Sequence, residues 1–154
     1  STSIMKFIFF LIGISLGTRI ELHNNCDRQI EVVRKDYLSA PVLQATLGPN
    51  EQAGVNYFEF VISCFQSGFD GLNDACFALG AKEDDFYWFI YDGGFDTPMM
   101  IETNRGPTRS CLSYACPDGE MYSNASTGGT FTLTFCPTAV LTEPENNEFD
   151  NQIV

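Results

Sequence analysis

The sequence predicts an all-β fold, and two observations support that prediction. In residues 130–135, Phe131, Leu133 and Phe135 alternate with threonines, which is the period of two of a strand buried on one face only. No stretch of the chain shows sustained helical periodicity, and its short alternating segments are separated by Gly, Pro and Asn turn signals. Many short strands joined by turns favour a β-sandwich or a flattened barrel.

The first half of the chain contains four expected strands. Residues 18–24 and 29–34 alternate between apolar and polar side chains and are separated by an Asn-containing turn, so they predict two neighbouring strands. Residues 41–47 predict a third strand, which ends at a Gly-Pro-Asn turn, and residues 53–63 predict a fourth. Residues 64–81 are polar, glycine-rich and aperiodic, and we expect them to form a loop.

The second half contains three expected strands. Residues 86–91 are apolar on both faces, as expected of a central strand that is covered on each side. Residues 98–102 predict a short strand, and residues 103–116 predict a loop. The strand at 130–135 ends at Cys136, and a bridge from there to Cys26 would join the first and last strands.

The two ends of the chain differ in composition from residues 18–137, which we expect to form one domain. Lys6 precedes a short apolar run and then small residues, which indicates a secretory signal peptide over residues 1–17, with 1–4 upstream of its true start. The apolar run is too short to span a membrane, and a buried core helix is the alternative. Residues 138–154 are acidic and Asn-rich, which predicts a disordered tail.

Charge and cysteine content restrict the class of partner. The chain has 20 acidic and 8 basic residues and a net charge of −12, which disfavours nucleic acid and suits cationic partners or neutral sugars. All six cysteines follow residue 17, as expected of three disulfides in a secreted, extracellular protein. We expect structural disulfides and neither a metal site nor a cofactor. The spacing of the cysteines leaves several pairings open.

Three segments, in the right order, resemble the thaumatin-like protein family. Residues 20–26 (IELHNNC) resemble its opening, residues 86–98 (FYWFIYDGGFDTP) align without gaps to its FYDVSLVDGFNLP motif, and residues 116–137 resemble its ending, from CPD to FCP. The resemblance implies a disulfide-stapled β-sandwich or flattened barrel. It also implies that only residues 105–115 stand where larger members have a cysteine-rich second domain.

The resemblance also implies a disulfide pairing. The family joins the cysteine of NNC to that of FCP, which gives Cys26–Cys136. One cysteine remains on each side of the missing domain, which gives Cys111–Cys116. Cys64 and Cys76 are then the third pair.

Candidate site residues follow from the acidic cleft found in many thaumatin-like proteins. Trp88 and Gly93 stand where the family has cleft aspartates, whereas Asp92, Asp96 and Asp118 remain as acidic candidates. Glycoside hydrolysis needs two carboxylates at a fixed separation, so the loss of two acids favours binding over catalysis. On this hypothesis the ring of Trp88 packs on a sugar while the aspartates accept hydrogen bonds from hydroxyls; the alternative is a core tryptophan.

The resemblance, together with the charge and the cysteines, implies a secreted, monomeric, defence-related antifungal protein. It would bind cell-wall polysaccharide such as β-1,3-glucan. One alternative is a weak endo-β-1,3-glucanase that uses Asp92, Asp96 and Asp118, and another is a secreted inhibitor of a hydrolase. Asn124 begins an Asn-Ala-Ser sequon and is a candidate N-glycosylation site.

Overall fold

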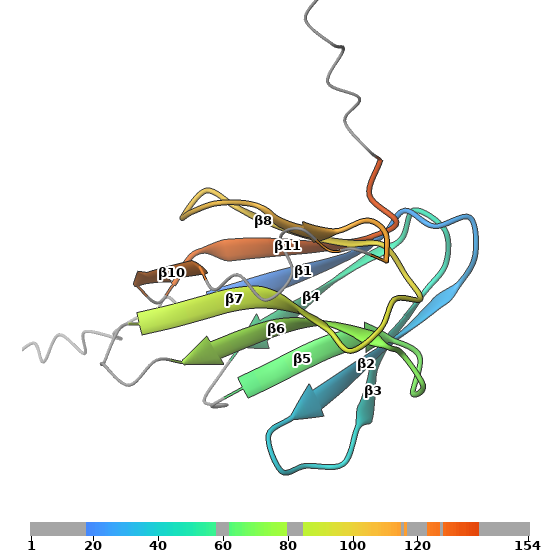
Figure 1. Ribbon diagram of the computed structural model, residues 1–154, viewed down its shortest axis with the longest axis horizontal. Coiled ribbons are helices and arrows are strands. Elements are labelled where there is room, and N and C mark those ends of the chain that lie inside the picture. Colours follow the sequence, from blue (N-terminus) through green and yellow to red (C-terminus); the bar gives the residue numbers. More distant parts are fainter. Residues whose placement is uncertain are drawn as a thin grey trace, which may run out of the picture.

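The computed structural model describes most of the expected domain as two β-sheets that face each other (Figure 1). The described residues are 18–57, 62–79, 85–114, 116, 123–126 and 128–138. The expected signal peptide, nearly all of the expected acidic tail and Asp118 lie outside them. The signal peptide, the domain boundaries and the tail therefore stay predictions.

The first sheet contains the beginning and the end of the described chain. β1 and β11 lie side by side and parallel, with Leu22 opposite Leu133, and the other pairs in this sheet are antiparallel. Joining the two ends in this way places the last strand inside the sheet, where both of its edges are hydrogen-bonded. The strand order is β4 (Gln52–Tyr57), β1 (Thr18–Asn24), β11 (Thr130–Phe135), β8 (Met99–Thr103) and β9 (Arg109–Cys111).

The second sheet is antiparallel throughout and contains the six remaining strands. A β-bulge between Val32 and Val33 interrupts the pairing of β2 with β3, and both of these valines are buried. The strand order is β10 (Ser123–Ser126), β7 (Asp85–Asp92), β6 (Asn73–Leu79), β5 (Ile62–Ser67), β2 (Ile30–Asp36) and β3 (Val42–Leu47).

The core fills the space between the sheets and is centred on Phe131 of β11. The ring centroid of Phe131 lies 5.8 Å from that of Phe77, 5.1 Å from Phe86 and 5.0 Å from Trp88. All four side chains are fully buried. The alternation seen in residues 130–135 therefore places Phe131, Leu133 and Phe135 in the core, as the sequence predicts.

Three disulfides cross-link the fold, in the pairing that the family resemblance implies. Cys26–Cys136 ties the residues after β1 to those after β11, Cys64–Cys76 joins facing residues of β5 and β6, and Cys111–Cys116 closes a short loop after β9. The first spans 110 residues, so the chain-entropy model gives it the largest stabilisation, about 4–5 kcal/mol.

The expected loop over residues 64–81 is wrong, because this segment contains most of β5 and all of β6. Residues 73–77 of β6 are all buried, so this part of the strand has no exposed positions to alternate with buried ones. The expected strand over residues 53–63 corresponds to β4 and the start of β5. The expected loop over 103–116 also contains a short strand, β9.

Candidate functional site

Trp88 lies in the core, which corrects its assignment to a ligand-binding cleft. Its side chain is fully buried, and its indole nitrogen donates a hydrogen bond to the carbonyl oxygen of Pro107 at 3.1 Å. Gly106 lies close to the ring, since a Cβ at that position would be 2.7 Å from it. A ring enclosed in this way cannot stack on a sugar.

The neighbours of Trp88 on β7 face the other way. Successive side chains of a strand point to opposite faces, so Tyr87, Phe89 and Tyr91 lie on the outer face of the six-stranded sheet. Tyr91 is 49% exposed, and the other two are half-buried. We call Tyr87, Phe89 and Tyr91 the aromatic strip; strand geometry spaces its members about 6.6 Å apart.

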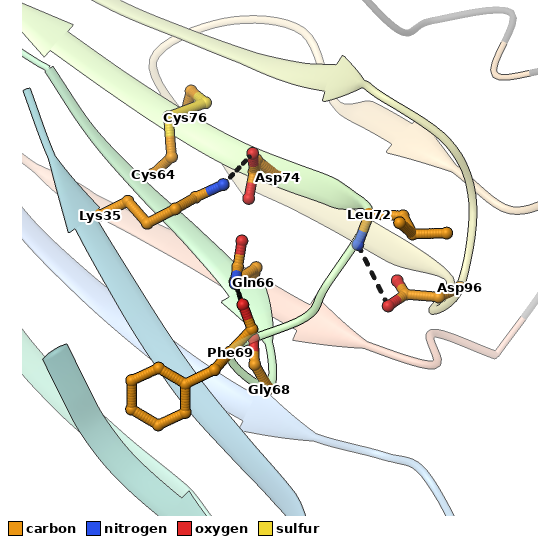
Figure 2. Close-up of polar contacts among 9 residues, drawn as sticks. All are labelled: Lys35, Cys64, Gln66, Gly68, Phe69, Leu72, Asp74, Cys76 and Asp96. Carbon is orange, nitrogen blue, oxygen red and sulfur yellow. Dashed lines mark hydrogen bonds and ion pairs between the residues drawn. A yellow bond between two sulfur atoms is a disulfide. The ribbon is translucent and has the colours of Figure 1, made fainter. Parts of the chain in front are cut away.

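The strand register places a disulfide and an ion pair beside the aromatic strip. Across four neighbouring strands, Phe89 of β7 is paired with Cys76 of β6, Cys76 with Cys64 of β5, and Cys64 with Lys35 of β2. Tyr91 is opposite Asp74. These side chains therefore share the outer face of one sheet, and Figure 2 shows Lys35 and Asp74 pointing toward each other beside the disulfide.

Asp74 is an acid in an unusual environment. Only 6% of it is exposed, and its Oδ2 accepts a hydrogen bond from Lys35 Nζ at 2.7 Å. Burial raises the pKa of Asp74 above its ordinary value; the hydrogen bond and charge of Lys35 act in the opposite direction, and the charge of Asp96 raises the pKa further. Asp74 lies in residues 64–81, which the sequence predicts to be a loop, so its burial on a strand is not expected from the sequence.

Two polar side chains hold the turns at this edge of the sheet. Gln66 Nε2 donates to the carbonyl oxygens of Gly68, at 2.7 Å, and Phe69, at 2.9 Å. Asp96 Oδ2 accepts a hydrogen bond from the backbone nitrogen of Leu72 at 3.2 Å (Figure 2). The turn between β5 and β6 is thus fixed from within, and Asp96 ties it to the loop after β7.

Of the three acidic candidates expected from the sequence, only Asp96 has a side chain that the structure describes. Asp96 is exposed at the edge of the outer face, as described above. Asp92 is paired with Asn73 through the backbone, but its side chain and all of Asp118 lie outside the described part of the chain. Asn124 is in β10, opposite Tyr87, and its side chain is likewise not described.

Gly93 has little space for the aspartate that the family has at this position. A Cβ there would lie 3.0 Å from the carbonyl oxygen of Leu72 and 3.0 Å from a ring carbon of Tyr91. Any larger residue would have to displace one of these neighbours. The packing of Leu72 and Tyr91 therefore accounts for glycine at the end of β7.

A second surface lies on the five-stranded sheet. It is a shallow open groove of about 830 Å³, and none of its lining side chains is aromatic. It offers hydroxyl, amide and charged groups, but no ring on which a sugar could stack. The lining residues are Glu102, Thr103, Asn104, Arg105, Thr108, Gly129, Thr130 and Thr132.

Within the described ranges, no group of three or more His, Cys, Asp or Glu side chains is arranged to hold a metal ion. Nor does any helix in the described residues have the length and apolar character needed to cross a membrane.

Comparison with known proteins identifies the fold. No protein-family model and no curated protein matches the sequence. The protein elicitor MoHrip2 from Magnaporthe oryzae superimposes with a TM-score of 0.62 at 15% identity, over 78% of this chain and 99% of that one. The thaumatin-like xylanase inhibitor TLXI superimposes with a TM-score of 0.60 at 14% identity, over 77% of this chain and 99% of that one. With its two sheets and three disulfides, this all-β chain has a thaumatin-like fold.

Proposed function

We propose that this protein is a secreted, defence-related binding module. It binds a neutral cell-wall polysaccharide such as β-1,3-glucan on the outer face of the six-stranded sheet, and it does not cleave it. The observation that carries the proposal is the aromatic strip, because three rings on one strand face outward beside polar groups. Its similarity in fold to a protein elicitor and to a xylanase inhibitor supports a role in defence.

The chemistry of the outer face suits a neutral sugar. The apolar face of a pyranose packs on an aromatic ring, and hydroxyls pair with nearby polar groups. Tyr91 presents half of its surface to solvent, and the exposed carboxylate of Asp96 lies at the same edge as an acceptor. The net charge of −12 repels polyanions and leaves a neutral glycan unaffected.

The two carboxylates near the aromatic strip, those of Asp74 and Asp96, support binding more than hydrolysis. Cleavage of a glycosidic bond needs an acid and a second carboxylate that both reach the bond. Asp74 has a raised pKa, but it is buried and bonded to Lys35. Asp96 is already bonded to the backbone of Leu72. This pair therefore gives the glucanase alternative no support.

Co-sedimentation with insoluble β-1,3-glucan tests the proposal. Loss of one stacking ring costs about 1 kcal/mol, so Tyr91→Ala should weaken retention roughly fivefold. Tyr37→Ala is the matched control, because Tyr37 is 64% exposed in the β2–β3 turn, away from the aromatic strip. Equal retention of wild type and Tyr91→Ala, or release of reducing sugar by the wild type, would contradict the proposal.

A second candidate function, inhibition of a secreted hydrolase, is favoured by the hairpin between β2 and β3. Leu38 is 90% exposed and has a φ of 61°, a left-handed conformation that is unfavourable for leucine. Tyr37, Val42 and Leu43 are also exposed nearby. An exposed apolar hairpin of this kind suits a protein target.

The two candidate functions use different residues, so the same variants separate them. Inhibition assays against secreted xylanases and glucanases should respond to Leu38→Ser and Tyr37→Ala if the hairpin binds a hydrolase. They should not respond to Tyr91→Ala. If Tyr91→Ala weakens co-sedimentation with glucan while Leu38→Ser and Tyr37→Ala leave it unchanged, glycan binding is supported.

A further inference from the structure

Two buried acceptor oxygens meet on the outer face of the six-stranded sheet. Phe65 of β5 is paired with Ala75 of β6. The next residues toward the β5–β6 turn are Gln66 and Asp74, which are therefore neighbours on adjacent strands. Figure 2 shows the amide oxygen of Gln66 directed toward the carboxylate of Asp74. Gln66 is 1% exposed and Asp74 is 6% exposed. Among the described residues, neither Gln66 Oε1 nor Asp74 Oδ1 has a hydrogen-bond donor.

The orientation of the Gln66 amide is fixed by its own hydrogen bonds. Its nitrogen donates both hydrogens, to the carbonyl oxygens of Gly68 and Phe69. Rotating the amide by half a turn would place its oxygen against two carbonyl oxygens and lose both bonds. The oxygen of Gln66 therefore has to face Asp74, whose other oxygen is bonded to Lys35.

A proton on Asp74 resolves this contact. A buried acceptor without a partner costs about 1–3 kcal/mol, and an ionised Asp74 would leave two of them facing each other. A carboxylic acid has one O–H donor. We propose that Asp74 takes up a proton from solvent on Oδ1 and donates it in a hydrogen bond to Gln66 Oε1, while Oδ2 continues to accept from Lys35. We call Lys35, Gln66 and Asp74 the proton latch.

The charged and titratable groups around Asp74 come from several elements. Lys35 on β2 favours the ionised form, whereas Asp96 in the loop after β7 favours the protonated form. Tyr91 faces Asp74 from β7, and the neutral Cys64–Cys76 disulfide lies on the other side. Burial has the largest effect, and it raises the pKa of Asp74.

The raised pKa of Asp74 determines how the stability of the fold changes with pH. A raised folded-state pKa means that the native state binds the proton more tightly than the unfolded chain does. The stabilisation is complete below the ordinary aspartate value of about 3.9. It is lost as the pH rises through the folded-state pKa of Asp74. The proton latch therefore stabilises the fold in an acidic medium.

The proton latch also links the protonation of Asp74 to the shape of a surface turn. Gln66 holds the carbonyls of the turn between β5 and β6, and this turn carries the exposed side chains of Phe69 and Leu72. Ionisation of Asp74 removes the bond that anchors Gln66 to β6. We expect the protection of the amides of residues 68–71, measured relative to the intrinsic exchange rate at each pH, to decrease as the pH rises through the titration of Asp74, whether or not the protein binds a glycan.

Carboxyl NMR titration and stability curves for the full-length protein test the proton latch. In the wild type, the Asp74 carboxyl should titrate above its ordinary value, and the midpoint temperature should fall as the pH rises through that titration. Asp74→Asn keeps an acceptor for Lys35 and supplies an N–H for Gln66. It should therefore abolish this pH-dependent fall. Asp27→Asn, at an exposed position, is the matched control and should retain it.

Two results would overturn the proposal. The first is an Asp74 that titrates at or below the ordinary value, because an ionised Asp74 bridged to Gln66 by a water molecule would behave in that way. The second is an Asp74→Asn variant whose stability falls with pH as steeply as that of the wild type. If Asp74→Asn does not fold, the wild-type titration decides alone.

Discussion

Replacing Trp88 is the sharpest test of how the core is organised. Truncating a buried tryptophan to alanine costs about 3–5 kcal/mol, and loss of the indole bond to Pro107 adds about 1 kcal/mol. Domains of this size are stable by about 5–15 kcal/mol, so Trp88→Ala should remove about a quarter or more of the free energy of unfolding. Trp88→Phe keeps one ring against Phe131 and should cost about 2 kcal/mol.

Urea denaturation measures both variants, and fluorescence gives an independent check. Because the chain has a single tryptophan, its emission reports on Trp88 alone. The native protein should emit at short wavelength and resist quenching by acrylamide, since Trp88 is fully buried. Tyr91→Ala is the control and should cost about 1 kcal/mol or less. A native Trp88 that acrylamide quenches freely, or a cost below 1 kcal/mol for Trp88→Ala, would refute this reasoning.

Three other predictions concern stability. Gly106→Ala should cost about 1–3 kcal/mol, because its Cβ would lie 2.7 Å from the Trp88 ring; unchanged urea unfolding would contradict that packing. Replacing both Cys26 and Cys136 by serine should cost about 4–5 kcal/mol, and a loss under 1 kcal/mol by calorimetry would show that the other contacts of β1 with β11 suffice. Removal of residues 138–154 should leave the midpoint temperature nearly unchanged, since the acidic tail has few apolar residues to bury; a drop of several degrees would mean that it docks.

The strands that are well predicted from the sequence are those with one solvent-facing side. β1 and β11 have the predicted bounds because apolar and polar residues alternate along them. β6 was missed because its residues 73–77 are buried on both faces, so neither polarity nor period distinguishes them from an irregular segment. The spacing of Cys64 and Cys76 is compatible with facing strands, but it is equally compatible with a loop.

The candidate site was harder to predict for a reason of geometry. The alignment that placed Trp88 at a cleft position fixes a residue number and not a face, and a shift of one residue along a strand reverses the face. The solvent-facing rings are therefore the neighbours of Trp88. The proposed hydrogen bond from Asp74 to Gln66 would join two strands, one of which the sequence does not predict, so the sequence alone could not reveal it.

The claim that a neutral glycan binds beside the aromatic strip is tested most directly by mapping amide chemical shifts. A soluble β-1,3-linked oligosaccharide would be titrated into the isotope-labelled protein. We predict shifts in β6 and β7 around Asp74 and Tyr91, with the oligosaccharide intact after prolonged incubation. Shifts confined to the groove beside Arg105 or to the hairpin at Leu38, no shifts at all, or cleaved sugar would contradict the claim.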